Sequence, residues 1–366
     1  MKKSIFRILF LFAIISICVG NSNQINANEK GNKHVESAEK HDNTEIKKFN
    51  AGEFIINHVV DHYSWHIFTY KDTHVSLHLP VILYSKTKGL VCFSSKRIEH
   101  GHAYKNFKLA ENGNIVEIDN NGKIVGPVLD ISITKNVFAL FFSCGLLLII
   151  FLSVAKSYTR NKDLPPKGLQ SLLEPLIIFI RDDVAKASIG EKNYEKFTPF
   201  LLTIFFFILF NNLLGLIPII PGGANVTGNI TITLVLALFT FIVTTISGNK
   251  NYWKHIFNGP GIPWWLKAPV PLIPFIELVG IFIKPFVLMV RLFANITAGH
   301  IIGLGFLSLI FIFGNIEPYL GYAVSPVTII FTVFMSILEL LVAFIQAYVF
   351  TVLSSIFFGM ATEDGH

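Results

Sequence analysis

The stretch Pro285-Phe-Val-Leu-Met-Val-Arg291-Leu-Phe-Ala-Asn295-Ile-Thr-Ala-Gly299-His300 places one arginine inside the longest apolar region of the chain. No other charged residue lies within six residues of Arg291 on either side. A guanidinium stays protonated at ordinary pH, and a charge inside a bilayer costs about 2.5–3.5 kcal/mol on insertion scales. Snorkelling to the interface is typical of helix ends, and Arg291 is far from one. We therefore interpret Arg291 as a functional charge that meets a mobile negative group.

The composition is typical of a polytopic membrane protein. Hydrophobic residues make up 52% of the 366 residues, and 35 residues are Phe. The net charge is +6, and cytoplasmic loops rich in Lys and Arg explain this excess better than nucleic-acid binding does. The sequence contains no Gly-rich phosphate loop followed by Lys-Ser or Lys-Thr, so we expect neither nucleotide nor another cofactor on this chain.

The N-terminus predicts a secretory signal peptide at residues 1–27. Basic residues precede a short apolar stretch at residues 8–19, which is too short to span a membrane comfortably. Cys18 leaves a lipoprotein signal open, although Ile17 is large for the position before a lipidated cysteine. The polar residues 28–49 predict a disordered linker.

Residues 50–134 predict a small β-rich domain that is exported. Val75–Tyr84 and Leu90–Ser95 show apolar and polar alternation, and Asn112-Gly113 and Asn121-Gly122 are hairpin signals.

Three histidines of this domain, His58, His62 and His66, are spaced by four residues and leave a zinc site open. The segment Tyr63-Ser-Trp65 indicates an extended strand instead, and Cys92 is the domain's one cysteine. We therefore favour solvated histidines, and we expect no metal and no internal disulfide.

Residues 135–366 predict an all-α membrane domain with about five crossings. The apolar spans are residues 136–155, 198–220, 229–247, 270–313 and 322–358. An amphipathic stretch at residues 168–187 lies in the polar loop after the first span and predicts a cytoplasmic helix.

The distribution of Lys and Arg predicts the orientation of these spans. Loops 156–198 and 248–269 are positively charged, whereas loops 221–228 and 314–321 contain neither Lys nor Arg. The positive-inside rule then places the first two loops and the C-terminus in the cytoplasm, and the exported domain outside. Trp264-Trp265 would lie at the cytoplasmic interface as an aromatic anchor.

The last two spans are too long to stand upright in a bilayer. Their 44 and 37 residues reach ~66 and ~55 Å as helices, against a hydrocarbon core of ~30 Å. We expect them to tilt steeply or kink, with Pro274 and Pro285 as kink sites, and to form a hairpin that can follow a curved partner.

An antiparallel hairpin that turns near Pro318 brings polar residues of the two long helices together. Arg291 then lies level with Gln346, and His300 lies level with Glu339. The two pairs are not fully compatible. Arg291 and His300 are nine residues apart and face opposite sides of their helix, whereas Glu339 and Gln346 are seven residues apart and face the same side of theirs. This mismatch disappears if the helix twists near Gly299, or if Arg291 faces a partner other than Gln346.

The chemistry of these residues suggests a divided role. His300 and Glu339 can both gain and lose a proton and suit a relay, with a structural ion pair as the alternative. Arg291 cannot relay a proton, but it can force a passing carboxylic acid to ionise. Asn212 and Asn295 fit either a polar path or simple helix joining, and Gly299 with Gly303 favours close packing.

At this point the residues resemble a known family. The runs Arg291-Leu-Phe-Ala-Asn295-Ile-Thr-Ala-Gly299-His300 and Glu339-Leu-Leu-Val-Ala-Phe-Ile-Gln346-Ala-Tyr-Val-Phe350 are similar to the two signature helices of subunit a of the F-type ATP synthase. Ile180-Arg181-Asp182, Ile189-Gly190 and the turn from Asn212 to Pro218 are also similar. The resemblance covers roughly residues 130–360.

The resemblance implies a stator with two offset half-channels and a gate. Arg291 corresponds to the gate arginine that faces a carboxylate of the rotating c-ring, with Asn295 and Gln346 as its polar neighbours. Glu277 matches a family carboxylate near the cytoplasmic half-channel. At His300 and Glu339 the acid and the imidazole are exchanged relative to many bacterial versions, as in mitochondrial ones, which supports a contacting pair.

The implied partners are the c-ring, the peripheral-stalk b subunits, the F1 sector indirectly, and lipid, but not nucleic acid. The implied location is a bacterial inner membrane, and the chain is expected to have no catalytic activity by itself. The alternative is a stand-alone secondary transporter or channel, although no internal repeat of that class is visible. The choice between proton and sodium, and the role of residues 50–134, stay open.

Overall fold

The computed structural model describes residues 50–70, 73–98, 102–110, 113–119, 123–126, 128–160, 165–217, 222–258 and 272–363. The predicted signal peptide at 1–27, the linker at 28–49 and Trp264-Trp265 lie outside these residues. The described residues form two compact units. The first contains residues 139–296 and 340–363, and the second contains residues 50–138 and 297–339.

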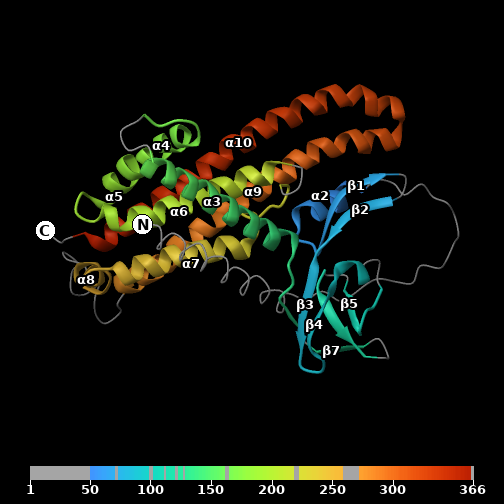
Figure 1. The fold of residues 1–366 in the computed structure, drawn as a ribbon, viewed down its shortest axis with the longest axis horizontal. Helices are drawn as coiled ribbons and strands as arrows, with labels where there is room; N and C mark the ends of the chain where they lie inside the picture. Colours follow the sequence, from blue (N-terminus) through green and yellow to red (C-terminus); the bar gives the residue numbers. More distant parts are fainter. Residues whose placement is uncertain are drawn as a thin grey trace. The chain divides into compact units, whose positions relative to one another are not determined.

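Among the described residues, five helices are long and apolar enough to cross a membrane, as the sequence predicted. They are α3 (Lys135–Arg160), α6 (Tyr194–Leu216), α7 (Ile230–Ser247), α9 (Leu272–Ile316) and α10 (Pro318–Thr362) (Figure 1). A short helix, α8 (Lys250–Asn258), follows α7. The membrane part is therefore all-α and multi-pass.

The connection between α9 and α10 is shorter than predicted. Each helix has 45 residues, and only Glu317 separates them, whereas the sequence predicted a loop at residues 314–321. Pro318 begins α10, where its missing N–H costs no helical hydrogen bond. A Cβ on Gly321 would meet Gly314 Cα at 2.9 Å. The two glycines thus permit a close approach of the helices instead of ending them.

Within the second unit, α9 and α10 run antiparallel. Phe306 stacks on Phe331 with ring centroids 5.5 Å apart. His300 meets Glu339 on one side of this pair along the hairpin, and Gly314 meets Gly321 on the other. Partners therefore occur in opposite order along the two helices, in the register predicted for His300 and Glu339.

The core of the first unit is α6. In its apolar window 61% of residues are buried, against 11% in each of α9 and α10. Phe206 packs edge-on against Phe151 of α3, and Phe205 packs edge-on against Phe344 of α10. The two long helices therefore leave many apolar side chains exposed, which lipid or another protein can cover.

The predicted amphipathic stretch at residues 168–187 is helical. It consists of α4 (Leu169–Phe179), a π-helical turn η4 (Ile180–Lys186) and α5 (Ala187–Ile189). The hydroxyl of Ser355 on α10 donates to the carbonyl of Val184 at 3.2 Å. A Cβ on Gly359 would meet Ser188 O at 2.1 Å, so α10 needs a glycine there to pack against this segment.

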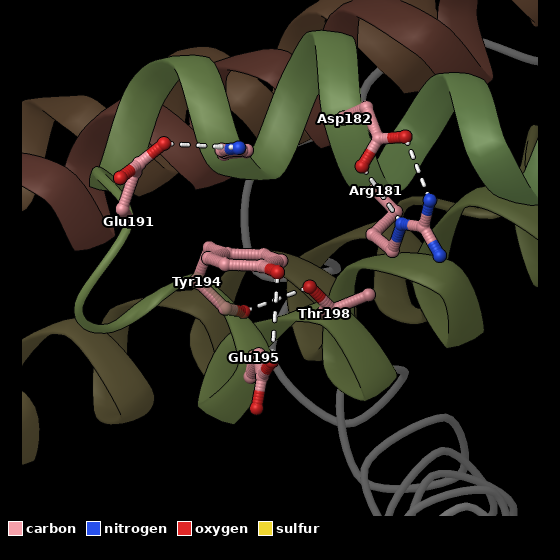
Figure 2. Close-up of polar contacts among 7 residues, drawn as sticks. Arg181, Asp182, Glu191, Tyr194, Glu195 and Thr198 are labelled. Carbon is pink, nitrogen blue, oxygen red and sulfur yellow. Dashed lines mark hydrogen bonds and ion pairs between the residues drawn. The ribbon is translucent and has the colours of Figure 1, made fainter.

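Charged residues of the same segment pair with their neighbours (Figure 2). The Arg181 guanidinium donates two hydrogen bonds of 2.7 Å to the Asp182 carboxylate and holds the pKa of that carboxyl below its usual value. Lys186 lies 3.0 Å from Glu191. These pairs are exposed, so we expect them to orient the segment more than to stabilise it.

The N-terminal part of the second unit is β-rich, as predicted, and begins with a helix that the sequence did not predict, α2 (Ala51–Val59). The strands are β1 (Ser64–Tyr70), β2 (Thr73–His78), β3 (Pro80–Ser85), β4 (Gly89–Ser94), β5 (Phe107–Leu109), β6 (Ile115–Ile118), β7 (Ile124–Gly126) and β8 (Leu129–Asp130). They form three small antiparallel sheets, β1-β2, β4-β3-β8 and β5-β6-β7.

A small apolar core joins the β4-β3-β8 sheet to the β5-β6-β7 sheet. Its buried members are Val81, Leu83, Val91, Phe93, Ile98, Phe107 and Ile115. Gly113, at a φ of +81°, allows the predicted turn between β5 and β6. The other hairpin signal, Asn121-Gly122, lies outside the described residues.

Candidate functional site

Arg291 lies on the outward face of α9. Leu288, Leu292 and Ile296 on the same helix are buried, with exposed fractions of 1%, 1% and 8%. Arg291 and Asn295, one turn apart, are both exposed. The helix therefore buries its apolar stripe in the first unit and directs the arginine and the asparagine away from it.

The structure does not pair Arg291 with Gln346. Gln346 is buried, with an exposed fraction of 7%, whereas Arg291 is exposed. Within the part of the chain that the structure describes, neither side chain forms a hydrogen bond or an ion pair. Of the two alternatives, a twist near Gly299 or a different partner for Arg291, this favours the different partner.

His300 and Glu339 are brought together in the second unit. His300 Nδ1 lies 3.9 Å from Glu339 Oε1, and the two side chains are only 20% and 16% exposed. This distance allows an ion pair but is too long for a hydrogen bond. Glu339 Oε1 is buried without a hydrogen-bond partner among the described residues.

Glycine residues make room for this carboxylate. A Cβ on Gly299 would lie 3.0 Å from Glu339 Oε1 and 3.2 Å from its Cγ, whereas one on Gly303 would lie 3.6 Å from Oε1. The carboxyl group therefore rests against the backbone of α9 at Gly299. A small side-chain movement could close the gap to His300, which suits a transient proton transfer.

Asn212 joins three segments of the first unit. Its Nδ2 donates to Ala343 O of α10 at 3.0 Å, and Thr227 Oγ1 donates to its Oδ1 at 2.6 Å. The residue is 4% exposed, and both ends of its amide are occupied. This geometry favours helix joining over a place in a polar path.

Glu277 lines a cavity of about 450 Å³ in the first unit. Lys284 of α9, His255 of α8 and Glu363 after α10 line the same cavity. The sequence did not predict a role for these three residues. Lys284 could have been found, because a lysine in a long apolar run is itself a functional signal. His255 and Glu363 carry no such signal, since only the fold brings them to Glu277.

The predicted site residues thus fall into two groups, each described within its own unit. Arg291, Asn295, Gln346, Asn212 and Glu277 belong to the first unit, and His300 and Glu339 belong to the second. Among the described residues, no three His, Cys, Asp or Glu side chains are grouped as a metal site requires.

Comparison with known sequences separates the two parts of the chain. Residues 54–133 match a family described as a domain of unknown function (DUF8433). Residues 137–359 match the family described as ATP synthase A chain. The second match covers more than half of the chain and contains all seven predicted site residues.

Curated relatives point the same way. The chain is 46% identical over 239 residues to the "ATP synthase subunit a" of Chloroherpeton thalassium, and the aligned region covers 63% of this chain and 67% of the relative. It is 46% identical over 251 residues to "ATP synthase subunit a 2" of Prosthecochloris aestuarii, with 67% and 73% covered. For the Myxococcus xanthus "ATP synthase subunit a", identity is 41% over 243 residues, with 65% and 75% covered. The chain therefore belongs to the ATP synthase A chain family, the subunit a of F-type ATP synthases.

Proposed function

We propose that this chain is the proton-conducting stator of a rotary ATP synthase and that Arg291 is its gate. The observation that carries this proposal is the exposed Arg291 on α9, which has no hydrogen bond or ion pair among the described residues. A buried arginine that served the fold would have a partner in its own chain. A carboxylate on a neighbouring ring of c subunits supplies the missing partner.

The electrostatics of such a gate follow from its fixed charge. A carboxylic acid that passes the guanidinium is favoured in its ionised form and gives up its proton. The same charge opposes a proton that hops directly past Arg291, so ions cross only by riding on the ring. Asn295, exposed on the same face, can hydrogen-bond to the ring carboxylate, and Gln346 adds a polar group level with the gate.

Two groups of side chains are suited to the half-channels on either side of the gate. His300 and Glu339 form a proton-exchanging pair that can load the ring carboxylate from outside. Glu277 and the cavity that it shares with Lys284, His255 and Glu363 can release the proton toward the cytoplasm. Asn212 supports the outer path by fixing α6 to α10.

The partners follow from this role. The c-ring lies against α9 and α10, which leave most of their surface uncovered, and the peripheral-stalk b subunits hold the chain against rotation. The F1 sector is coupled only indirectly, so this chain has no catalytic activity alone. The protein lies in a bacterial inner membrane with its N-terminal domain in the periplasm and its C-terminus in the cytoplasm.

Replacement of Arg291 by Ala tests the proposal in the assembled complex. Gradient-driven ATP synthesis in membrane vesicles should fall by about 10²-fold or more, as when a single electrostatic stabiliser is lost. The amount of c-ring that co-purifies should be unchanged, because Arg291 forms no hydrogen bond or ion pair with the described residues of its own chain. Normal synthesis in the variant would refute the gate. Coupled substrate uptake by the chain reconstituted without a ring would favour a stand-alone transporter instead.

A further inference from the structure

The β4-β3-β8 sheet of the second unit has one buried face and one exposed face. Burial alternates along β3 and β4, and the side chains on the buried side belong to the small apolar core. The exposed face of an antiparallel sheet is ordinarily polar. Here the positions on the exposed side are apolar: Ile82, Tyr84, Leu90, Cys92, Leu129 and Ile131.

The strand register places these side chains next to one another. Tyr84 pairs with Leu90 of β4 and with Leu129 of β8, so the three side chains form a row across the sheet. Their exposed fractions are 49%, 68% and 46%. Contiguous apolar side chains on a surface indicate an interaction site. Two residues along each strand, a second row contains Ile131, Ile82 and Cys92.

This face carries no negative charge from its three strands. β3 and β4 contain neither Asp nor Glu. Asp130 of β8 points to the other side, and its carboxylate accepts hydrogen bonds from the Tyr63 hydroxyl and from Ser132 N. The exposed Lys86 and Lys88 lie in the turn between β3 and β4. An apolar face with a basic edge suits a lipid surface that contains anionic headgroups.

The sheet ends close to the residue at which α3 begins. Ile133 N donates to Pro80 O of β3 at 3.2 Å, and α3 begins two residues later at Lys135. Asn136 N donates to Asp61 Oδ1 at 3.0 Å. Asp61 is buried at this junction, which raises the pKa of its carboxyl. The domain is therefore held at the first turn of a membrane helix by its own hydrogen bonds.

The composition of α3 places this junction at the bilayer surface. Residues 136–155 carry no charge and lie between Lys135 and Lys156. As a helix they span ~30 Å, which is the thickness of the hydrocarbon core. Lys135 is therefore at the boundary between hydrocarbon and headgroups. Two extended residues reach ~7 Å, and the headgroup region adds about 5–7 Å on each side, so the Pro80 end of the sheet lies at the headgroups.

We propose that the exposed face of the β4-β3-β8 sheet rests on the surface of the membrane that α3 enters. Tyr84, Leu90 and Leu129 then contact the interfacial layer, in which tyrosine is ordinarily enriched. The charges of Lys86 and Lys88 attract the phosphate groups of anionic lipids. The domain, whose own family is described only as of unknown function, thereby anchors the chain at the bilayer surface. This inference does not depend on the role of Arg291.

Cys92 provides the probe, because it is exposed and lies opposite Ile82 on this face. The full-length chain, with its other two cysteines replaced by alanine, is labelled at Cys92 with a fluorophore in nanodiscs of phosphatidylethanolamine and phosphatidylglycerol. Nitroxide-bearing lipids should quench this fluorophore at least about threefold more strongly than one at a control position, since interfacial side chains lie within reach of the lipid. Iodide in the water should show the opposite preference.

Lys108→Cys in a Cys92→Ser chain supplies the control position. Lys108 is exposed on β5, whereas its neighbour Phe107 is buried in the core between the two sheets. The side chain of Lys108 therefore points away from the core and away from the β4-β3-β8 sheet. A fluorophore there should meet water in the same chain and the same nanodiscs.

Leu90→Asp tests the contact itself. A carboxylate in the apolar row is disfavoured at an anionic lipid surface, so lipid quenching at Cys92 should fall to the level of the control position. Lys108→Asp adds the same group on the opposite side and should leave quenching at Cys92 unchanged. Leu90 is largely exposed, so its replacement should not prevent folding, and circular dichroism checks this.

Two results would overturn the inference. Iodide quenching at Cys92 as strong as at the control position would show that the face meets water. Protection of Cys92 from both quenchers would show that protein, such as a second copy of the chain, covers the face instead of lipid. Neither result bears on the gate, because these measurements do not involve ATP synthesis, and Arg291→Ala tests the gate separately.

Discussion

Gly299→Ala should disturb the His300–Glu339 pair without weakening the helix that carries it. The added Cβ would stand 3.0 Å from Glu339 Oε1 and 3.2 Å from Cγ. Both distances are shorter than ordinary contacts, so the glutamate must move by a few tenths of an ångström. Alanine is also the better helix former, by about 1 kcal/mol relative to glycine, so α9 itself should not be destabilised.

The size of the effect follows from the geometry of the pair. His300 Nδ1 and Glu339 Oε1 are already 3.9 Å apart, and proton transfer needs an approach to about 2.6–3.2 Å. Misplacement by 1 Å can cost about 10²-fold in rate. If the logarithm of the rate falls linearly with displacement, a shift of roughly 0.3–0.5 Å predicts a loss of about four- to tenfold in proton-driven ATP synthesis.

Gly303→Ala provides a matched control on the same helix. Its Cβ would meet the same Glu339 Oε1 at 3.6 Å, which is an ordinary contact. Both variants add one methyl group and the same helix propensity, and they differ in the displacement of the carboxylate. ATP synthesis in vesicles, normalised to the amount of co-purified c-ring, should separate them. Equal activity of the two variants would refute the argument that the position of Glu339 limits transfer.

Two further predictions concern titratable residues of the second unit. Exchange of His300 and Glu339 for each other should preserve more synthesis than either single alanine change, as expected of a coupled pair; additive losses would contradict a working contact. Asp61→Asn should remove the part of the stability that depends on the titration of this buried carboxyl. The folded domain keeps a proton on Asp61 at pH values where the unfolded chain has lost it, so wild-type stability falls as pH rises through that window. We would measure the melting temperature of the purified wild type and variant between about pH 4 and about pH 8. The melting temperature of the variant minus that of the wild type should increase toward the higher pH, and a difference that does not change with pH would contradict the raised pKa of Asp61.

The membrane helices were predictable because apolar length is a strong and local signal. The sequence predicts about five spans, and the described residues contain five candidate helices. The pairing of His300 with Glu339 was also predictable. The position of the turn fixes which residues of a helical hairpin lie opposite each other, and Pro318 indicated that position. Hydrophobicity says nothing, however, about which glycine ends a helix. Gly314 and Gly321 were read as loop residues, although they permit close helix contact.

Other features depend on contacts that distant segments make, and pattern alone could not supply them. The cavity at Glu277 includes His255 and Glu363, which are not adjacent to Glu277 in the sequence. Helix α2 was missed because nine residues form a weak periodic signal. Its last turn is held to α3 by the Lys135 Nζ, which donates to the carbonyl of His58.

The exposure of the membrane helices indicates that the chain works together with another protein. Most residues in the apolar window of α6 are buried, whereas only 11% of those in the windows of α9 and α10 are buried. Lipid alone can cover apolar side chains, but it cannot balance the guanidinium of Arg291, which has no counter-ion among the described residues. Under the proposed function this counter-charge must also be replaceable, because a permanent ion pair between Arg291 and a c-ring carboxylate would stop rotation. A series of identical carboxylates that pass one fixed arginine meets both requirements, and a single bound anion meets only the first.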